Sequence, residues 1–310
     1  MKLDQSNIKI AKKYLDKDNC IGIPTETVYG LAANAYSNKA VKKIFELKKR
    51  PRSNPLIVHY SNLAQLDKDC YLNKNFLKLY RKFCPGPLTF ILDLKRKSKI
   101  SKIVTNNKKT LAIRFPKNNI LKKLLNITNY PLAAPSANIS SRVSAVQASD
   151  IKEDFKNKIP YILNGGKSKI GLESTIISLT KSPLILRLGG LEISKIEKVL
   201  KRKIRIVSNS TKHKFPGQSK LHYSPGIPVR INVKKTKPYE AFLLIKKRKK
   251  SSKNYYYLSK NSNLKDVAKN LYSYFRKIKK KGYRSIAIEK IPNIGIGKTI
   301  NDRLKRASRY

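Results

Sequence analysis

Apolar residues recur at the spacing of a helix in several stretches of the first 200 residues. Between positions 7 and 17, Ile8, Ala11 and Leu15 fall on one helical face. A second helix is expected after Asn38, where apolar positions again repeat every three or four residues. The same pattern predicts further helices over 74–83, 118–126 and 193–201.

Short apolar runs lie between these helices and predict buried strands. The run 20–23 stops at a proline, and the run 56–59 ends with His59. Helices and strands that alternate in this way favour an α/β or α+β fold, although they leave the strand order open. Further strands are expected over 88–92, 111–115, 161–163, 174–179 and 183–188.

A second α/β unit is expected towards the C-terminus. Between about 205 and 228, Ser, Asn, Pro and Gly cluster and the apolar periodicity fades, which is typical of a linker. The Lys-rich stretch 246–253 then reads as an exposed loop. Beyond the linker the pattern predicts strands over 241–245, 255–258 and 285–288, a long helix over 264–278 and a terminal helix near 298–308.

The length and composition fit two packed domains. At 310 residues with 40% apolar side chains, we expect a large domain over 1–205, a linker over 206–228 and a small domain over 229–310. No apolar run approaches the roughly 18 residues that span a bilayer, and the N-terminus lacks the apolar stretch of a secretory signal. The three cysteines and three histidines show no metal-binding spacing. A cytoplasmic protein without a zinc site or disulfide framework is expected.

The net charge is the unusual feature of the composition. Seventy Lys and Arg residues against 18 Asp and Glu give +52, which attracts polyanions and repels the protein from itself. A surface that binds RNA weakly is one interpretation. Compositional bias is the other, and it is favoured because the lysines are spread over the whole chain without an RNA-recognition motif.

Four segments break the ordinary pattern of core and surface, each beside a predicted strand. The first, residues 24–31, places Thr25, Glu26 and Thr27 directly after a buried strand and before a flexible Gly30. Hydroxyls and a carboxylate at a strand end suit a ligand loop. A tight polar turn in which a threonine caps a helix fits the same residues.

The second segment, residues 48–59, carries four cations between a helix end and a strand. Cations at a helix C-terminus are favoured by the helix dipole alone. Two prolines stiffen the segment, however, and would hold Arg50 and Asn54 in fixed directions that suit a triphosphate. His59 ends an otherwise apolar strand, a position that a hydrogen-bonded core histidine also fits.

The third segment contains Arg114 within an apolar strand, where a guanidinium is costly unless an anion pairs with it. With only 18 acidic residues in the chain, we expect a ligand carboxylate as its partner in place of an internal Asp or Glu. Ser136 and Asn138 follow a short apolar run and could line the same pocket, with Ser144 slightly further on.

The fourth segment is glycine-rich, with one Gly pair at 165–166 and another at 189–190. Neither is a Walker A loop or a dinucleotide fingerprint, and taken alone each pair predicts a turn. The chain contains no nucleophile elbow, Ser-His-Asp arrangement or HExxH motif. The sequence therefore predicts a site that works by positioning and charge neutralisation.

Taken together and in this order, the segments resemble the YrdC-like L-threonylcarbamoyladenylate synthases. The remainder resembles the long form of this family, with residues 215–225 similar to its interdomain linker and 295–304 to its closing helix. Joint occurrence over about 190 residues is far more specific than any single motif. The matching pieces are PTETVYGLAANA, KKRPRSNPLIVH, PGPLTFIL, TLAIRFP, PSANISSRVS, GLESTII and ILRLGG.

The resemblance implies both a fold and a reaction. The fold is a twisted mixed α/β sheet with an open concave face, followed by a small Rossmann-like C-terminal domain. The implied enzyme is a nucleotidyltransferase that uses L-threonine, bicarbonate and ATP. The threonine amine captures carbon dioxide as a carbamate, which attacks the α-phosphate and expels pyrophosphate. Mg²⁺ carried by the ATP phosphates is expected, without an organic cofactor. The product would supply a transferase complex that makes threonylcarbamoyladenosine (t6A) in tRNA.

Carried over position by position, the resemblance assigns two sets of ligands and no catalytic residue. L-threonine would be held by Thr27, His59, Arg114, the backbone of Ala134 and Ser174, with Arg114 on its carboxylate. Tyr223 would close over the nucleotide as a lid. ATP would be held by Lys48, Arg50, Asn54, Thr110, Ser136, Ser144, Arg187 and Tyr223.

Four positions depart from the family's usual pattern without removing a proposed ligand. Lys49 and Ser141 stand where the family usually has Gly, Leu188 stands where Pro is common, and Asn164 stands where Asp is common. These changes bear on loop geometry and rate. They do not alter the expected reaction class.

Two other functions fit parts of the sequence. A non-catalytic RNA-binding protein would account for the charge, and it predicts binding that weakens steeply with salt. A hydrogenase-maturation carbamoyltransferase shares a related domain but needs Cys-rich zinc fingers. Cys20, Cys70 and Cys84 cannot supply them.

Overall fold

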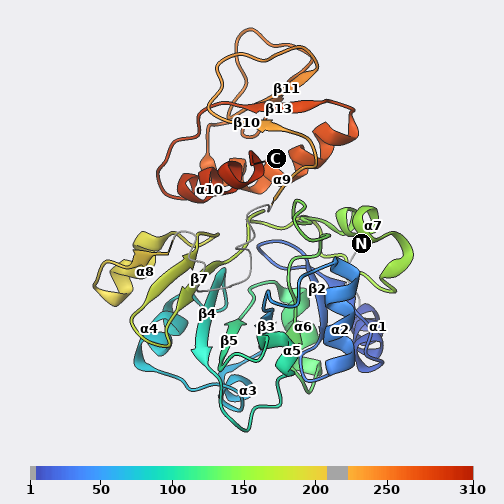
Figure 1. The fold of residues 1–310 in the computed structure, drawn as a ribbon, viewed down its shortest axis with the longest axis vertical. Coiled ribbons are helices and arrows are strands. Elements are labelled where there is room, and N and C mark those ends of the chain that lie inside the picture. Colours follow the sequence, from blue (N-terminus) through green and yellow to red (C-terminus); the bar gives the residue numbers. More distant parts are fainter. Residues whose placement is uncertain (1–4, 208–222, 310) are drawn as a thin grey trace.

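The computed structural model describes residues 5–207 and 223–309, which form a large and a small domain stacked on each other (Figure 1). The large domain is built on a mixed sheet with the strand order β1-β2-β6-β3-β5-β4-β7-β8-β9. In that order the strands span Ile21–Ile23, Gly30–Asn34, Leu132–Ala133, Ile57–His59, Thr110–Arg114, Leu88–Asp93, Thr175–Ser178, Leu184–Arg187 and Arg205–Ile206.

The two faces of this sheet differ because successive side chains in a strand point to opposite sides. Val58 of β3 and Ile113 of β5 point into the main core. Their neighbours Ile57 and Ala112 point to the other face, where a smaller apolar cluster adjoins the candidate site. Helices therefore cover the whole of one face and leave part of the other face for a pocket. The covering helices are α2 (Asn38–Lys48), α4 (Lys74–Phe83), α5 (Lys102–Thr105) and α8 (Ile193–Leu200).

A separate apolar cluster closes the edge of the sheet near β1. It joins Ile8, Ala11 and Leu15 of α1 (Gln5–Asp16) to Leu121 and Leu124 of α6 (Asn119–Ile127). The spacing of these residues is the helical pattern read from the sequence. The remaining short elements are α3 (Leu63–Asp67), α7 (Ala148–Phe155) and the 3₁₀ turn η1 (Lys156–Lys158).

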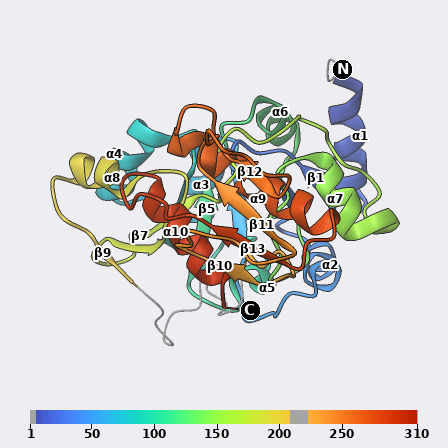
Figure 2. The same cartoon turned by 90° about the horizontal axis from the view of Figure 1, so that it is seen from above.

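The small domain is a parallel sheet with the strand order β10-β13-β11-β12. Two helices lie between this sheet and the large domain (Figure 1), and the small domain sits over the middle of the large one (Figure 2). Its elements are β10 (Val229–Arg230), β11 (Glu240–Leu244), β12 (Tyr255–Tyr257), α9 (Leu264–Lys280), β13 (Ser285–Ile288) and α10 (Gly297–Ala307).

One buried apolar cluster joins the two domains. Val28, Val143 and Leu172 of the large domain pack in the same buried cluster as the apolar faces of α9 and α10. At Gly171 the backbones of the two domains lie close together, since a Cβ there would lie 2.6 Å from the Lys269 Cα atom of α9. A side chain at this position would push the domains apart.

The structure confirms the α/β fold, and the predicted helices match to within two residues at either end. The strand expected over 161–163 was wrong, because only a single bridge joins Ile162 to Gly22. Most of the expected linker, residues 208–222, lies outside the described residues. Within the described ranges, no helix combines the length and apolar character needed to cross a membrane.

Candidate active site

One row of paired residues crosses the face of the large sheet that lies opposite the main core. His59 of β3 pairs with Arg114 of β5, and Arg114 pairs in turn with Thr89 of β4. The row continues through Ile176 to Arg187 of β8. Because paired residues on neighbouring strands point to the same face, the register brings these side chains together. Residues far apart in the sequence thus form the floor of one pocket.

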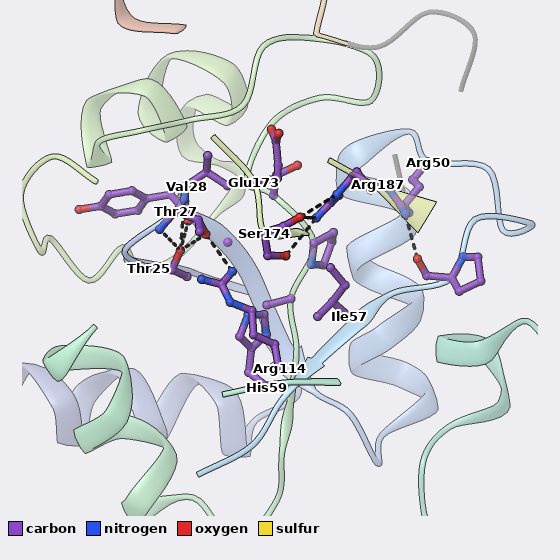
Figure 3. Close-up of a pocket in the computed structure, with 16 residues that line it drawn as sticks. Thr25, Thr27, Val28, Arg50, Ile57, His59, Arg114, Glu173, Ser174 and Arg187 are labelled. Atoms are coloured by element: carbon purple, nitrogen blue, oxygen red, sulfur yellow. Dashed lines mark hydrogen bonds between the residues drawn. The ribbon is translucent and has the colours of Figure 1, made fainter. Parts of the chain in front are cut away.

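The pocket combines this floor with four loop segments and is shown in Figure 3. Its cavity has a volume of about 40 Å³, which leaves room for little more than a water molecule. Three arginine side chains, Arg50, Arg114 and Arg187, are among the residues that line it. The lining residues are Thr25, Thr27, Val28, Tyr29, Gly30, Arg50, Pro55, Ile57, His59, Arg114, Ala134, Pro135, Ser136, Glu173, Ser174 and Arg187.

Arg114 lies at the centre of the threonine half of the predicted site and is 4% exposed. Its Nη1 atom donates to Thr27 Oγ1 at 2.8 Å, and Nε donates to the Gly86 carbonyl at 3.3 Å. Nη2 lies 2.7 Å from Glu26 Oε1 in a buried ion pair. The expectation that Arg114 lacks an internal acidic partner was wrong, because the loop after β1 brings Glu26 across the sheet.

His59 lies beside Arg114 with 2% of its surface exposed. Its ring approaches the backbone of Leu132, yet neither ring nitrogen reaches a full hydrogen bond within the described residues. Burial, and then the positive charge of Arg114, lower the pKa of His59 to about 3. The imidazole is therefore neutral at physiological pH and has unused hydrogen-bonding capacity in the pocket.

The loop after β1 is held in shape by its own hydroxyls. Thr25 Oγ1 accepts from the backbone N–H groups of Thr27 and Val28 at 3.1 and 3.2 Å. The same atom lies 2.7 Å from Thr27 Oγ1, which in turn receives Arg114. The loop is thus a polar turn, as one interpretation of the sequence held, but the expected helix cap was wrong because strand β2 follows the loop. The turn also supplies part of the pocket wall.

Arg50 and Arg187 form the opposite end of the pocket. Arg50 Nη2 donates to the Pro55 carbonyl at 2.9 Å, and Arg187 Nη2 donates to the Ser174 carbonyl at 2.9 Å. Burial, and then the nearby charge of Arg187, lower the pKa of Arg50 to about 9. Arg50 is buried and Arg187 is half-buried, and two neighbouring guanidinium groups that repel each other favour the binding of a multiply charged anion between them.

Ser174 connects the two ends. Its Oγ atom lies 2.7 Å from Thr89 Oγ1 and accepts from Arg187 Nη2 at 3.1 Å. Glu173 precedes it and lines the pocket at 5% exposure. Sequence reasoning did not single out Glu173 or Thr89. Thr89 stands in the apolar run 88–92, and Glu173 precedes a strand, so neither carried a signal of its own.

The structure brings together eight of the predicted ligands. The backbone N–H of Ala134 is engaged by the Ile57 carbonyl at 2.8 Å, so Ala134 offers only its carbonyl to a ligand. Ser136 keeps its Oγ atom 2.6 Å from Asn138 Oδ1 at the rim. The eight are Thr27, Arg50, His59, Arg114, Ala134, Ser136, Ser174 and Arg187.

Two further predicted ligands, Lys48 and Ser144, act on the pocket through other groups. The buried Lys48 Nζ donates to the carbonyls of Ser136 (2.6 Å) and Asn138, and so fixes the loop that carries Ser136. Ser144 Oγ donates to Glu173 Oε1 at 2.6 Å. Neither residue belongs to the pocket lining.

The other three predicted ligands also lie outside the lining. Thr110 begins β5 at the end remote from Arg114. Asn54 carries a buried Oδ1 atom without a hydrogen-bond partner among the described residues. The Tyr223 ring is fully buried, stacked on Tyr272 at 5.9 Å between ring centroids. Tyr223 therefore packs against the small domain in this structure.

The departures at Lys49 and Ser141 have a geometric consequence. Both residues have positive φ angles, 50° for Lys49 at the C-cap of α2 and 71° for Ser141. This left-handed region favours glycine, which the resemblance gives as the usual residue at both positions. Here a longer side chain is carried at a backbone cost of about 1 to 2 kcal/mol at each position.

Comparison with known proteins gives consistent matches over the whole chain. A family model described as "Telomere recombination" (Sua5_yciO_yrdC) matches residues 13–189. A second, described as "Threonylcarbamoyl-AMP synthase, C-terminal domain", matches residues 191–309. The two models meet close to the end of the large domain.

Individual relatives agree with the family models. The chain is 35% identical to a threonylcarbamoyl-AMP synthase of Pyrococcus abyssi, over 100% of this chain and 96% of the relative. It is 33% identical to one of Bacillus subtilis, over 96% and 92% of the two chains. The crystal structure of P. abyssi Sua5 complexed with L-threonine superimposes with a TM-score of 0.91 at 33% identity, covering 100% of this chain and 96% of that one.

Proposed function

The chain belongs to the threonylcarbamoyl-AMP synthases of the Sua5/YrdC family, in the long form with a C-terminal domain, and from this premise we propose how its pocket divides the substrates. It is an enzyme, a nucleotidyltransferase that uses ATP, as the sequence predicted. Membership of this enzyme family contradicts the alternative of a non-catalytic RNA-binding protein. The family acts in the t6A modification of tRNA.

We propose that L-threonine binds around Arg114, Thr27, His59 and Ser174. A guanidinium has five N–H donors, and the three contacts of Arg114 leave two for the threonine carboxylate. Glu26 fixes the plane of the guanidinium from behind. The structure of the P. abyssi relative, described as complexed with L-threonine, supports a threonine site in this fold.

Neutral His59 suits the first chemical step. A threonine amine must lose its proton before its lone pair can attack carbon dioxide. A nearby cation would repel the protonated amine, whereas a neutral imidazole can accept a hydrogen bond from the amine. The amine adds to the carbon dioxide formed when bicarbonate loses hydroxide, and the N–H proton leaves to give a carbamate. The unpartnered ring nitrogens of His59 carry this part of the proposal.

The second step places the ATP phosphates against Arg50 and Arg187. The carbamate oxygen forms a bond to the α-phosphorus while the bond to the bridging oxygen breaks, and pyrophosphate leaves with the electron pair. Two anions must meet, so fixed cations have to neutralise both. Substrate binding would draw Arg50 and Arg187 from the backbone carbonyls that they now contact and open the small cavity.

Mg²⁺ would arrive on the ATP phosphates. This ion keeps several waters and favours oxygen ligands, and Asn54, whose backbone carbonyl accepts from Arg50 Nε at 3.1 Å, would hold a water of its shell once the pocket opens. When bound it would neutralise phosphate charge and orient the leaving pyrophosphate. The product is a mixed anhydride, which a tRNA-modifying transferase complex would consume.

The test is a pyrophosphate-release assay with threonine, bicarbonate and ATP omitted in turn, combined with mass detection of the carbamoyl-adenylate. We expect release only when all three are present, and a loss of at least 100-fold in Arg114→Ala because its partner Glu26 then repels the carboxylate. Arg96→Ala removes an exposed arginine of the same domain and should retain full activity. Release that is independent of threonine would overturn the assignment.

A further inference from the structure

The last helix of the small domain reaches the wall of the pocket. Arg303 of α10 is 1% exposed, and its Nε atom donates to Glu173 Oε2 at 2.9 Å. Its Nη2 atom donates to the Leu188 carbonyl at 2.6 Å. Glu173 lines the pocket directly before Ser174, and Leu188 directly follows Arg187. One side chain thus contacts the neighbours of two proposed ligands.

Thr299, one helical turn earlier, makes a second contact of the same kind. Its Oγ1 atom donates to the Gly189 carbonyl at 3.0 Å. Gly189 lies so close to the segment that leads into β7 that an added Cβ would lie 2.2 Å from the backbone of Ser174. Together, Arg303 and Thr299 hold the end of β8 against the start of β7 at the point where both strands enter the pocket.

The charge of Glu173 explains why an arginine is needed here. Burial raises the pKa of Glu173, but Arg303 first and then Arg187 and Ser144 outweigh it, so the pKa falls below the ordinary value. The carboxylate is therefore ionised and buried between two guanidinium groups. If Arg303 were absent, Arg187 would be the remaining cation to neutralise Glu173. Arg187 would then be drawn towards Glu173 and away from the phosphates.

Arg303 also orders the residue proposed as a lid. Its guanidinium lies 4.5 Å from the centroid of the Tyr223 ring, which also stacks on Tyr272. Tyr272 OH donates to Glu173 Oε2 at 3.3 Å, so the ring sandwich and the ion pair form one buried cluster. A substitution of Arg303 would therefore disturb the packing of Tyr223 and the charge balance of Glu173 together.

We propose that Arg303 is a positioning residue for ATP, supplied by the small domain: it neutralises Glu173 and so keeps Arg187 available to the phosphates. The inference rests on the proposed division of the pocket, in which Arg187 binds ATP. It gives the small domain a part in the site that does not depend on the linker. The competing view is that the Arg303–Glu173 pair only holds the domains together.

The experiment separates these views with a double variant. Arg303→Met alone leaves a buried carboxylate without its main partner and should lower the melting temperature. Adding Glu173→Gln removes that charge, so it should restore the melting temperature and also release Arg187 from neutralising Glu173. The exposed Lys305→Met on the same helix is the matched control and should leave binding and activity unchanged.

ATP affinity is measured by calorimetry without turnover, and KM is measured for both substrates. We expect the affinity for ATP to fall at least tenfold in Arg303→Met and to recover in the double variant, with the KM for threonine changed less than twofold in both. An ATP affinity that stays reduced in the double variant would overturn the proposal, because Arg187 then has no Glu173 charge to neutralise. Equal losses for ATP and threonine would do the same. Because the calorimetric readout needs no product, it stands even if pyrophosphate release in the parent protein fails to depend on threonine.

Discussion

At the scale of single residues, His59 couples the pocket to pH. Its pKa is about 3 in the folded protein and 6.5 in an unfolded chain. As the pH falls below 6.5, the unfolded chain takes up a proton that the folded protein refuses. The free energy of unfolding should therefore fall, at up to about 1.4 kcal/mol per pH unit.

We expect His59→Gln to remove this contribution between pH 6.5 and pH 5, a window above the range in which most carboxylates titrate. Urea unfolding of the parent protein and the variant at several pH values measures the difference. The difference in the free energy of unfolding between the two should change steadily across the window. A constant difference would show that His59 gains its proton as easily in the folded protein as in the unfolded chain.

Arg114 shows how far residue-level reasoning from the sequence extends. The need for a buried anion was correctly read from an arginine in an apolar strand. The identity of the anion was not, because a count of 18 acids over the chain says nothing about which one the fold brings near. The pairing of β3 with β5 and the path of the loop after β1 together bring Glu26 to Arg114 in the folded protein.

At the scale of elements, the end of β8 depends on a residue without a side chain. A Cβ at Gly189 would collide with the backbone of Ser174, and backbone atoms of a paired strand cannot move away as a flexible side chain can. We expect Gly189→Ala to destabilise the protein by on the order of 3 kcal/mol and to reduce pyrophosphate release. Thermal unfolding and the release assay measure both effects.

Gly166→Ala is the matched control, because Gly166 has a positive φ of 72° but no atom within 4 Å of the added Cβ. It should cost only the backbone strain of about 1 to 2 kcal/mol. If both variants lose the same stability, close packing at Gly189 is not what holds β7 and β8 together.

Elements with a long periodic signal were predicted well and short ones were not. α4 carries its apolar stripe over ten residues, and its predicted bounds are correct. β6 contains two residues and β2 follows a polar loop, so neither produces a repeating pattern. Their place in the sheet is set by neighbours: β2 pairs with β1 and β6, which no local window of sequence contains.

At the scale of the whole molecule, the net charge of +52 acts against folding. Like charges spread over a compact surface repel one another, and salt shortens the reach of that repulsion from about 10 Å at 0.1 M to about 3 Å at 1 M. We expect the melting temperature to rise by several degrees when NaCl is raised from 0.1 to 1 M. Differential scanning fluorimetry measures it.

An acidic relative of similar fold would provide the comparison, since its melting temperature should respond less to the same salt. A melting temperature that falls with NaCl would mean that attractive ion pairs, such as Arg276 with Asp154, dominate the electrostatics. In that case the charged residues would form stabilising pairs, and compositional bias alone would not explain where they lie.

The contact between Arg303 and Glu173 spans 130 positions of the chain. On the ribosome the sheet and its loops are therefore made well before the helix that completes one wall of the pocket. Nascent large domain can fold around its own core, but it must wait for α10 before Glu173 meets its partner. Premature termination anywhere in the small domain would accordingly release a polypeptide with an unfinished pocket and a bare apolar surface, a natural substrate for chaperones and proteases.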